Sequence, residues 1–170
     1  MEGRAVLKEK ICVYPGSFDP ITLGHLDIIQ RAGNIFDQVI VAVAKNPSKN
    51  GGWMPVAKRK ELIYSSCRHL KNISVDSFEG LLIDYMEEKK ASVIIKGLRA
   101  VTDFESEFQM AQLNHQMKPT VETLFMMTSP QYAYISSSAV REIISFQGDV
   151  KELIPQVILE EVMNYRKNIT

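Results

Sequence analysis

The chain of 170 residues has few of the features that mark secreted, membrane or nucleic-acid-binding proteins. Its two cysteines, Cys12 and Cys67, lie far apart and form no C-x-x-C pair, so neither a disulfide framework nor a zinc knuckle is predicted. The 20 basic and 20 acidic residues cancel, whereas a general nucleic-acid or membrane-surface binder normally has a basic excess. No apolar run approaches the roughly 18 residues that span a bilayer, and residues 1–10 contain no apolar signal segment. We therefore expect a cytoplasmic protein that binds neither nucleic acid nor membrane.

What the chain does have is an apolar content suited to one enzyme domain. Hydrophobic residues make up 45% of it, and no linker, repeat or low-complexity tract divides it, so residues 1–170 are expected to form a single domain. Short β-branched runs alternate with segments of helical periodicity, which predicts an α/β fold with a doubly wound parallel five-stranded sheet. The strands are predicted at residues 11–14, 38–44, 73–78, 92–96 and 122–127. The helices are predicted at residues 23–36, 56–69, 81–89, 103–116, 138–147 and 155–167.

The most informative segment is residues 14–25, with the sequence Y-P-G-S-F-D-P-I-T-L-G-H. It joins the first predicted strand to the first predicted helix, so it faces a helix N-terminus whose free N–H groups favour a phosphate. Gly16 would let a ligand approach the backbone, Ser17 adds a hydroxyl, and His25 places an imidazole in the first helical turn. Each feature alone is commonly only a turn or an ordinary surface residue. Their ordered combination resembles the T/H-x-G-H signature of the nucleotidyltransferase superfamily.

Two more candidate phosphate contacts follow strands whose carboxyl ends should lie at the same edge of the sheet. In the loop 45–55, Lys49 could reach a phosphate there or remain a solvated loop lysine, and Trp53 could pack over the site or cover the core. The segment 96–99, K-G-L-R, ends the fourth strand with two cations that flank a glycine. Lysine supplies a point charge and arginine a planar fork, so this segment predicts a phosphate clamp.

The last informative segment is the serine run 136–138 in Y-I-S-S-S-A-V-R. Serines before a helix are by default an N-cap, but free N–H groups and hydroxyls can also form a second anion cradle, beside Arg141. In the preceding predicted helix, spacing alone makes Glu105 and Glu107 solvated surface charges. His69 and His115 are most simply surface or packing residues.

The four segments together resemble the bacterial phosphopantetheine adenylyltransferase family. The motifs P-G-S-F-D-P-I-T-x-G-H, N-P-S-K, K-G-L-R-A-V-T-D-F-E-x-E and Y-I-S-S-S-x-V-R-E occur in order between about residues 12 and 150. The resemblance implies a Rossmann-like nucleotidyltransferase fold and transfer of the adenylyl group of ATP to 4'-phosphopantetheine, which gives dephospho-coenzyme A and pyrophosphate. This is the penultimate step of coenzyme A biosynthesis. The resemblance further implies Mg²⁺ as cofactor, coenzyme A as a feedback ligand and a homohexamer, and it leaves protein ligands of the metal unassigned.

The resemblance also implies residue roles. His25 would stabilise the transition state, and Ser17 would lie between the two substrates. The ATP-binding residues would be Ser17, Phe18, His25, Gly97, Leu98, Arg99, Glu107, Tyr132, Ala133, Tyr134, Ile135, Ser136, Ser137 and Ser138. The 4'-phosphopantetheine-binding residues would be Ser17, Lys49, Leu82 and Lys96.

Two positions depart from the family's commonest pattern. Ser17 replaces a threonine and keeps the hydroxyl, whereas Lys96 replaces an arginine and loses the bidentate fork.

Two other readings of the sequence remain. A cytidylyltransferase or a nicotinate-mononucleotide adenylyltransferase would share the first loop, but a histidine is then expected in place of Thr22, with a different segment after the fourth strand. A non-catalytic nucleotide-binding module would not need Ser17, His25, Lys49, Arg99 and the serine run together.

Overall fold

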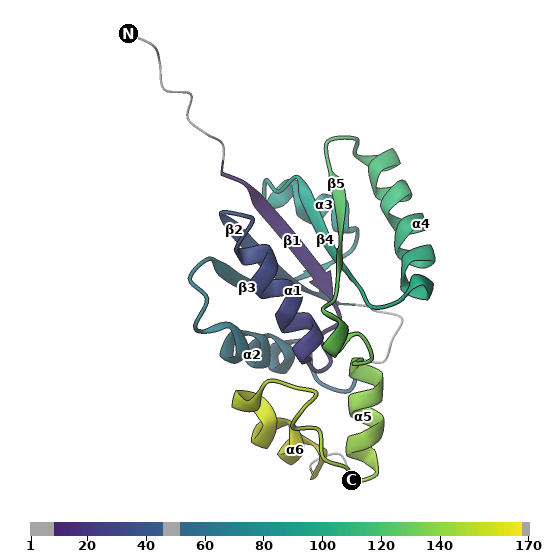
Figure 1. Ribbon diagram of the computed structural model, residues 1–170. Helices are drawn as coiled ribbons and strands as arrows, with labels where there is room; N and C mark the ends of the chain where they lie inside the picture. The colour runs from purple at the N-terminus through teal and green to yellow at the C-terminus, as the bar shows by residue number, and fades with distance from the viewer. Residues whose placement is uncertain (1–8, 46–51, 168–170) are drawn as a thin grey trace.

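Five parallel strands form one sheet in the order β3-β2-β1-β4-β5 (Figure 1). The computed structural model describes residues 9–45 and 52–167, with only the backbone of residues 166 and 167. The strands are β1 (Ile11–Gly16), β2 (Gln38–Lys45), β3 (Ile73–Glu79), β4 (Val93–Leu98) and β5 (Glu122–Met127). Because β1 is first in the chain but central in the sheet, the strand order reverses between β1 and β4. Ligands of such sheets bind outside the carboxyl ends of the strands at this point.

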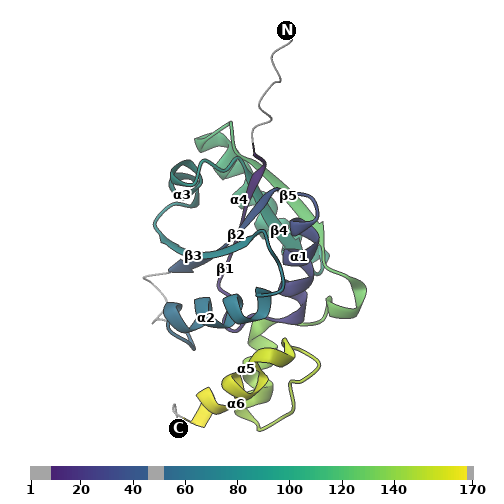
Figure 2. The same cartoon turned by 90° about the vertical axis from the view of Figure 1, so that its left-hand side faces the viewer.

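The helices follow the strands in the alternation that the sequence predicts. They are α1 (Leu23–Gly33), α2 (Val56–Cys67), α3 (Leu82–Glu88), α4 (Val101–Met117), α5 (Ser137–Ser145) and α6 (Leu159–Lys167), with short 3₁₀ turns η1 (Pro130–Tyr132) and η2 (Gln156–Ile158). In the view of Figure 2, α1 and α2 lie on one side of the sheet and α3 and α4 on the other. The predicted doubly wound α/β fold is therefore confirmed.

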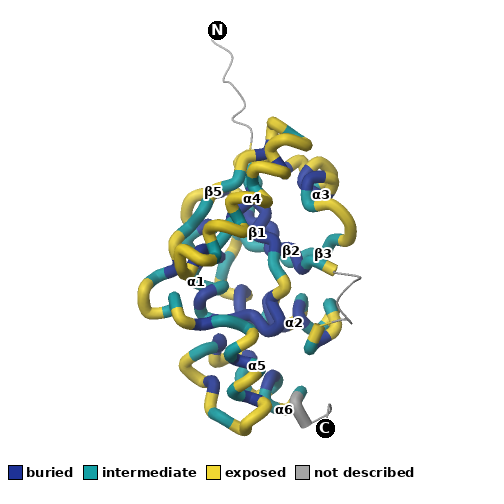
Figure 3. The backbone as a smooth tube through the Cα atoms, turned by 90° about the vertical axis from the view of Figure 1, so that its right-hand side faces the viewer, coloured by how far each residue is buried: buried dark blue, intermediate teal, exposed yellow. Residues whose placement is uncertain are grey.

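Both faces of the central strands are buried, as their continuous apolar character predicts (Figure 3). Along β1, Cys12 and Tyr14 pack into the core beneath α1 and α2, whereas Val13 packs into the core beneath α3. The period of two places alternate side chains on opposite faces. The edge strands β3 and β5 are only partly covered.

The C-terminal helices extend the α1–α2 side of the molecule (Figure 1). Val140, Ile144, Ile154 and Ile158 are almost completely buried in the same core as the residues of α1 and α2. An ion pair between Lys58 of α2 and Glu161 of α6 lies beside this contact. The chain therefore returns at its end to the helices that flank the first loop.

Several predicted element boundaries were wrong by two or more residues, and three of them have a clear structural reason. The strand β4 runs two residues further than predicted, because Gly97 and Leu98 continue the pairing with β5. The helix α1 ends at Gly33 rather than at residue 36, because the Asn72 side chain donates to the carbonyls of Gly33 and Phe36. The predicted helix 155–167 is divided into η2 and α6, since the amide of Ile158 bonds to Pro155 three residues before it.

Candidate active site

A cavity of about 410 Å³ lies at the carboxyl ends of β1 and β4, where the strand order reverses. Six segments form its walls: the end of β1 with the loop that follows it, the N-terminus of α1, the end of β4, the first turns of α4, Thr128 directly after β5, and the N-terminus of α5. They contribute the lining residues Tyr14, Gly16, Ser17, Phe18, Thr22, His25, Lys96, Gly97, Arg99, Asp103, Ser106, Glu107, Ile135, Ser136, Ser137, Ser138 and Arg141. The site predicted from the sheet rule is thus present as a polar cavity.

The first loop is built around the ring of Phe18. This residue has a positive φ of 47° and is only 1% exposed. Its ring centroid lies 5.4 Å from that of Tyr14 and 5.0 Å from that of His25. A Cβ atom on Gly16 would come within 2.9 Å of the Phe18 ring. The close approach that Gly16 permits in this structure is therefore that of the Phe18 ring.

His25 is held by a reciprocal cap at the start of α1. Its backbone N–H donates to Oγ1 of Thr22 at 3.3 Å, and the backbone N–H of Thr22 donates to Nδ1 of His25 at 3.1 Å. Thr22 is 1% exposed, so the cap is shielded from water. Burial, reinforced by the nearby positive charge of Arg99, lowers the pKa of His25 to about 4. The imidazole that lines the cavity is therefore neutral near pH 7.

The serine run forms the N-terminus of α5 and also contacts the first loop. Oγ of Ser136 accepts from the backbone N–H of Ala139 at 3.0 Å, which confirms the predicted N-cap. Oγ of Ser137 donates to the carbonyl of Pro20 at 2.8 Å, and Ser138 lies on the cavity wall. The N-termini of α1 and α5 therefore meet at the same cavity.

The cations of the cavity differ in how they are neutralised. The guanidinium of Arg99 forms a two-pronged contact with Asp103, with both N–O distances 3.0 Å, and this hydrogen bonding holds the pKa of Asp103 below its usual value. Nζ of Lys96 lies 3.0 Å from Oε2 of Glu107. Arg141 donates to the carbonyl of Asp19 at 2.6 Å and has no acidic partner in the described part of the chain. Arg141 thus leaves one uncompensated positive charge on the wall.

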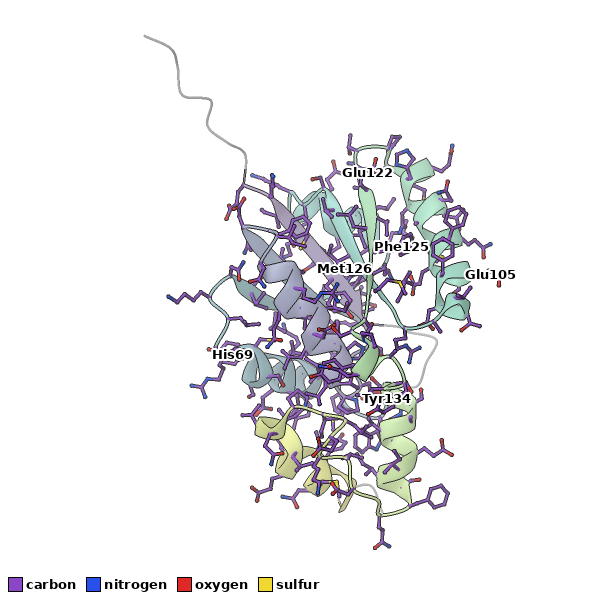
Figure 4. The ribbon with its side chains drawn as sticks, in the orientation of Figure 1. His69, Glu105, Glu122, Phe125, Met126 and Tyr134 are labelled. Atoms are coloured by element: carbon purple, nitrogen blue, oxygen red, sulfur yellow. The ribbon has the colours of Figure 1, made fainter. Side chains whose placement is uncertain are left out.

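The two glutamates of α4 behave differently. Glu105 is exposed and points outward, as spacing predicts (Figure 4). Glu107 lines the cavity, its side chain is 31% exposed, and its Oε2 atom is buried. The interpretation of Glu107 as a solvated surface charge was wrong, because the end of β4 places Lys96 beside this face of α4.

A second cavity of about 430 Å³ adjoins the first. Its walls include the apolar side chains of Phe78, Leu81, Leu82, Met110 and Met117, together with the amide of Asn114. Lys96 and Glu107 line both cavities, so their ion pair stands at the junction.

The structure brings most of the predicted site residues to these two cavities. Ser17, Phe18, His25, Lys96, Gly97, Arg99, Glu107 and Ile135 to Ser138 line the first cavity, and Leu82 lines the second. Leu98 is 5% exposed within β4, and Tyr132, Ala133 and Tyr134 do not line either cavity. Tyr134 is 71% exposed on the loop before α5 (Figure 4). Lys49 lies outside the described residues.

Sequence reasoning missed a buried polar cluster beneath the first loop. The carboxylate of Asp19 accepts from the amides of Trp53 and Met54 at 2.6 and 2.9 Å. The guanidinium of Arg59 donates to the carbonyls of Met54 and Ser17 at 2.8 and 3.1 Å. Both charged residues are no more than 5% exposed. This cluster joins the first loop to the segment that precedes α2, and no sequence motif indicates it.

Trp53 itself covers the core. Its ring packs edge-on against Tyr165 of α6, with a centroid distance of 5.5 Å, and it contacts the core beneath α1 and α2. His69 is exposed at the end of α2 and bonds to Gln30, which confirms its reading as a surface residue (Figure 4). Of the two alternatives for Trp53, packing on the core is the one observed.

A second missed cluster ties α1 to the end of β5. The carboxylate of Asp27 accepts from the backbone N–H and the hydroxyl of Ser129 at 3.0 and 2.8 Å, and from Arg31 at 3.2 Å. Burial raises the pKa of Asp27, but the hydrogen bonds from Ser129 and Arg31 together outweigh burial and lower it. Arg31 also donates to the carbonyl of Met127 at 2.6 Å. The helix that presents His25 thus also fixes the chain that leads to η1.

Comparisons with known proteins agree with this geometry. Residues 13–143 match a family model described as cytidylyltransferase-like. The phosphopantetheine adenylyltransferase of Alkaliphilus metalliredigens is 55% identical over 151 residues, which cover 89% of this chain and 96% of the relative. That of Clostridium tetani is 50% identical over 158 residues, which cover 93% and 98%.

The fold has a counterpart among solved structures. A Vibrio parahaemolyticus protein, described as a candidate nicotinate-nucleotide adenylyltransferase, superposes with a TM-score of 0.68 over 92% of this chain and 99% of its own. At 16% identity, this likeness supports the nucleotidyltransferase fold alone. The sequence identities of 50% and 55%, over nearly the whole length of both chains, show the family as well as the fold. This chain belongs to the phosphopantetheine adenylyltransferase family, within the cytidylyltransferase-like proteins.

Proposed function

We propose that the protein transfers the adenylyl group of ATP to 4'-phosphopantetheine and releases dephospho-coenzyme A and pyrophosphate. The observation that carries this proposal is the junction of two cavities at Lys96 and Glu107. One cavity is polar and faces two helix N-termini, whereas the other has mostly apolar walls. Such a pair suits a nucleotide on one side and a long acceptor on the other, with the acceptor phosphate between them.

The polar cavity suits the triphosphate of ATP. The positive ends of the α1 and α5 helix dipoles face this cavity and favour anions, and Arg141 adds a positive charge without an acidic partner in the described residues. Gly97, Arg99 and Glu107, which also line this cavity, would contact the rest of the nucleotide. We extend this assignment to Leu98 and to residues 132–138, as the family resemblance implies.

The apolar cavity suits the pantetheine arm. Leu82 and Met110 offer apolar walls, and Asn114 offers an amide for the arm's own amide groups. The phosphate of the acceptor would then contact Lys96 and Ser17 at the junction, with Lys49 as a further cation. In this proposal the attacking oxygen would lie beside the polar cavity.

The chemistry needs no covalent nucleophile on the protein. An oxygen of the acceptor phosphate attacks the α-phosphorus of ATP, a new P–O bond forms, and the bond from the α-phosphorus to the bridging oxygen breaks as pyrophosphate leaves. The protein therefore acts by aligning two anions and by stabilising charge in the transition state. His25, at the N-terminus of α1, is the group best placed for the second task.

Mg²⁺ is the cofactor that the family resemblance implies. Among residues 9–45 and 52–167, no group of three acidic, histidine or cysteine side chains could hold a metal ion. The described side chains therefore do not form a magnesium site of their own. Mg²⁺ is most simply brought by the phosphates of ATP, as is common for this ion.

The protein is further proposed to be a cytoplasmic homohexamer that coenzyme A inhibits. Phe104, Phe108, Leu113 and Met117 of α4 and Leu124 of β5 are each between 41% and 48% exposed, so a partner subunit could cover them. Coenzyme A contains the pantetheine arm of the acceptor and would compete for the same cavity. None of the described helices is long and apolar enough to cross a membrane. Sedimentation showing only a 19.3 kDa species would contradict the assembly.

A turnover assay tests the function. Pyrophosphate release is measured with ATP and 4'-phosphopantetheine, and in parallel with CTP and glycerol phosphate and with ATP and nicotinate mononucleotide. We expect release only in the first mixture, with formation of dephospho-coenzyme A. Turnover of nicotinate mononucleotide at a comparable kcat/KM would contradict the proposed acceptor.

A further inference from the structure

The bonds around His25 fix where its proton lies. A backbone N–H can only donate, and that of Thr22 points at Nδ1 of His25 from 3.1 Å. Nδ1 must therefore be the unprotonated nitrogen. A second possible donor, the hydroxyl of Thr22, lies 3.1 Å from the same atom, while its oxygen accepts from the backbone N–H of His25 at 3.3 Å. In a neutral ring the single proton is then on Nε2.

Of the two ring nitrogens of His25, Nε2 is the one left available to a ligand in the cavity. His25 lines the cavity, and no described residue makes a hydrogen bond to its Nε2 atom. An imidazolium would place a second N–H at Nδ1, directly against the N–H of Thr22. The charged and titratable side chains that share the cavity with His25 are Tyr14, Lys96, Arg99, Asp103, Glu107 and Arg141. Both acidic residues among them are already paired, Asp103 with Arg99 and Glu107 with Lys96.

We propose that Thr22 is a positioning residue which holds His25 as a neutral imidazole protonated at Nε2, so that His25 stabilises the transition state as a fixed hydrogen-bond donor and not as an acid. This inference deepens the proposed function, on which its catalytic part rests. The buried environment of the ring supports it, since the pKa of His25 is lowered to about 4. The first turn of α1 therefore fixes the orientation of the Nε2 proton, which remains on His25 throughout the reaction.

The position of the proton is measured on the free enzyme, without turnover. Ring ¹⁵N shifts of the three histidines are recorded by long-range ¹H–¹⁵N correlation on the full chain between pH 5 and 8. The variants His69→Gln and His115→Gln assign the other two rings. We expect a pyridine-type Nδ1 and a pyrrole-type Nε2 for His25 over this whole range. A proton on Nδ1, or an imidazolium at pH 7, would overturn the proposal.

Two substitutions of His25 test which nitrogen donates. The amide nitrogen of glutamine reaches the place of Nε2, whereas that of asparagine reaches the place of Nδ1. We expect His25→Asn to lose about 10² to 10³ in kcat, as for a lost oxyanion donor, and His25→Gln to lose at least tenfold less. An asparagine variant as active as the glutamine variant would contradict donation through Nε2.

Two substitutions of Thr22 test its role as a positioning residue. Thr22→Val keeps the shape but removes the hydroxyl, and Thr22→Ser restores it. The valine variant should lose about five- to tenfold in kcat with little change in KM for ATP, the size of one hydrogen bond, and serine should recover most of this loss. A loss in the serine variant alone, which lacks the methyl group that valine keeps, would assign the effect to packing of that methyl group and overturn the role of the hydroxyl. If the NMR result holds but no acceptor is adenylylated, the proposed function fails and the assignment of the proton stands.

Discussion

Replacing Lys96 by alanine tests the junction between the two cavities. A charge-assisted hydrogen bond to a phosphate contributes roughly 1.5 to 3 kcal/mol, so Lys96→Ala should raise KM for 4'-phosphopantetheine about 10- to 200-fold. KM for ATP should change much less, because the nucleotide is assigned to Gly97 and Arg99. Lys96→Arg keeps the charge and should change KM for the acceptor less than about threefold.

The carboxylate of Glu107 has a second effect on acceptor affinity, and its size can be calculated from the structure. Its Oε2 atom lies 3.0 Å from Nζ of Lys96, and a phosphate in contact with the far side of Nζ would come within about 6 Å of it. Two unit charges at about 6 Å repel by nearly 3 kcal/mol at an effective dielectric constant of about 20. With the Glu107 side chain 31% exposed, screening by water reduces this to about half, or roughly tenfold in affinity. In Lys96→Ala this repulsion has no compensating cation.

The double variant separates the two effects. Lys96→Ala/Glu107→Gln should bind 4'-phosphopantetheine about tenfold better than Lys96→Ala, a coupling that neither single variant predicts. The assay is steady-state kinetics with each substrate varied at saturation of the other, supported by calorimetric titration of 4'-phosphopantetheine in the absence of ATP. Equal acceptor affinity of Lys96→Ala and Lys96→Ala/Glu107→Gln would refute the repulsion. An unchanged KM in Lys96→Ala would remove Lys96 from the acceptor site.

Three further perturbations test the surroundings of the site. Arg59→Met breaks a buried charged cluster and should lower the free energy of unfolding, measured by urea titration, by about 3 to 5 kcal/mol. A loss as small as that of the exposed control Arg68→Met would contradict a stabilising role of the cluster. Asp27→Asn weakens the bonds to Ser129 and should raise KM for ATP about tenfold with an unchanged KM for the acceptor. The exposed control Asp84→Asn should change neither constant. Equal effects of Asp27→Asn on both substrates would refute the role of Asp27 in positioning the ATP side of the site. His25 stays neutral in the folded state, whereas a histidine in the unfolded chain takes up a proton near pH 6.5. Between pH 6.5 and 4 the free energy of unfolding of the wild type should therefore fall by on the order of 3 kcal/mol more than that of His25→Gln. Parallel pH profiles of the two proteins would refute the lowered pKa.

The sequence predicts the fold and the part of the site formed by the ends of β1 and β4 well, because both depend on local signals. The alternation of apolar runs fixes the parallel sheet, and the motifs around His25 and Arg99 mark strand ends that the sheet rule brings together. Asp103 could also have been found, since it follows Arg99 at the i,i+4 spacing of helical ion pairs. The single domain spanning residues 1–170 stays a prediction.

Other parts of the site depend on contacts that no local pattern encodes. Arg59 lies in the first turn of α2, and its link to the carbonyl of Ser17 joins residues 42 positions apart. The face of α4 that carries Glu107 is set by the position of that helix over β4, which spacing within the helix does not reveal. Tertiary packing, rather than the periodicity of either element, determines both.

The hydrogen bonds from Ser137 to Pro20 and from Arg141 to Asp19 span 117 and 122 positions of the chain. During synthesis, the first loop therefore leaves the ribosome long before the helix that completes the cavity. Contacts at such separation form late in folding, because the entropy of closing the intervening chain must be overcome first. ATP binding should accordingly appear only after α5 has docked, and a truncated nascent chain ending before residue 137 should not retain nucleotide. The shortest stalled chain that retains nucleotide would thus show at which chain length the last step of folding occurs.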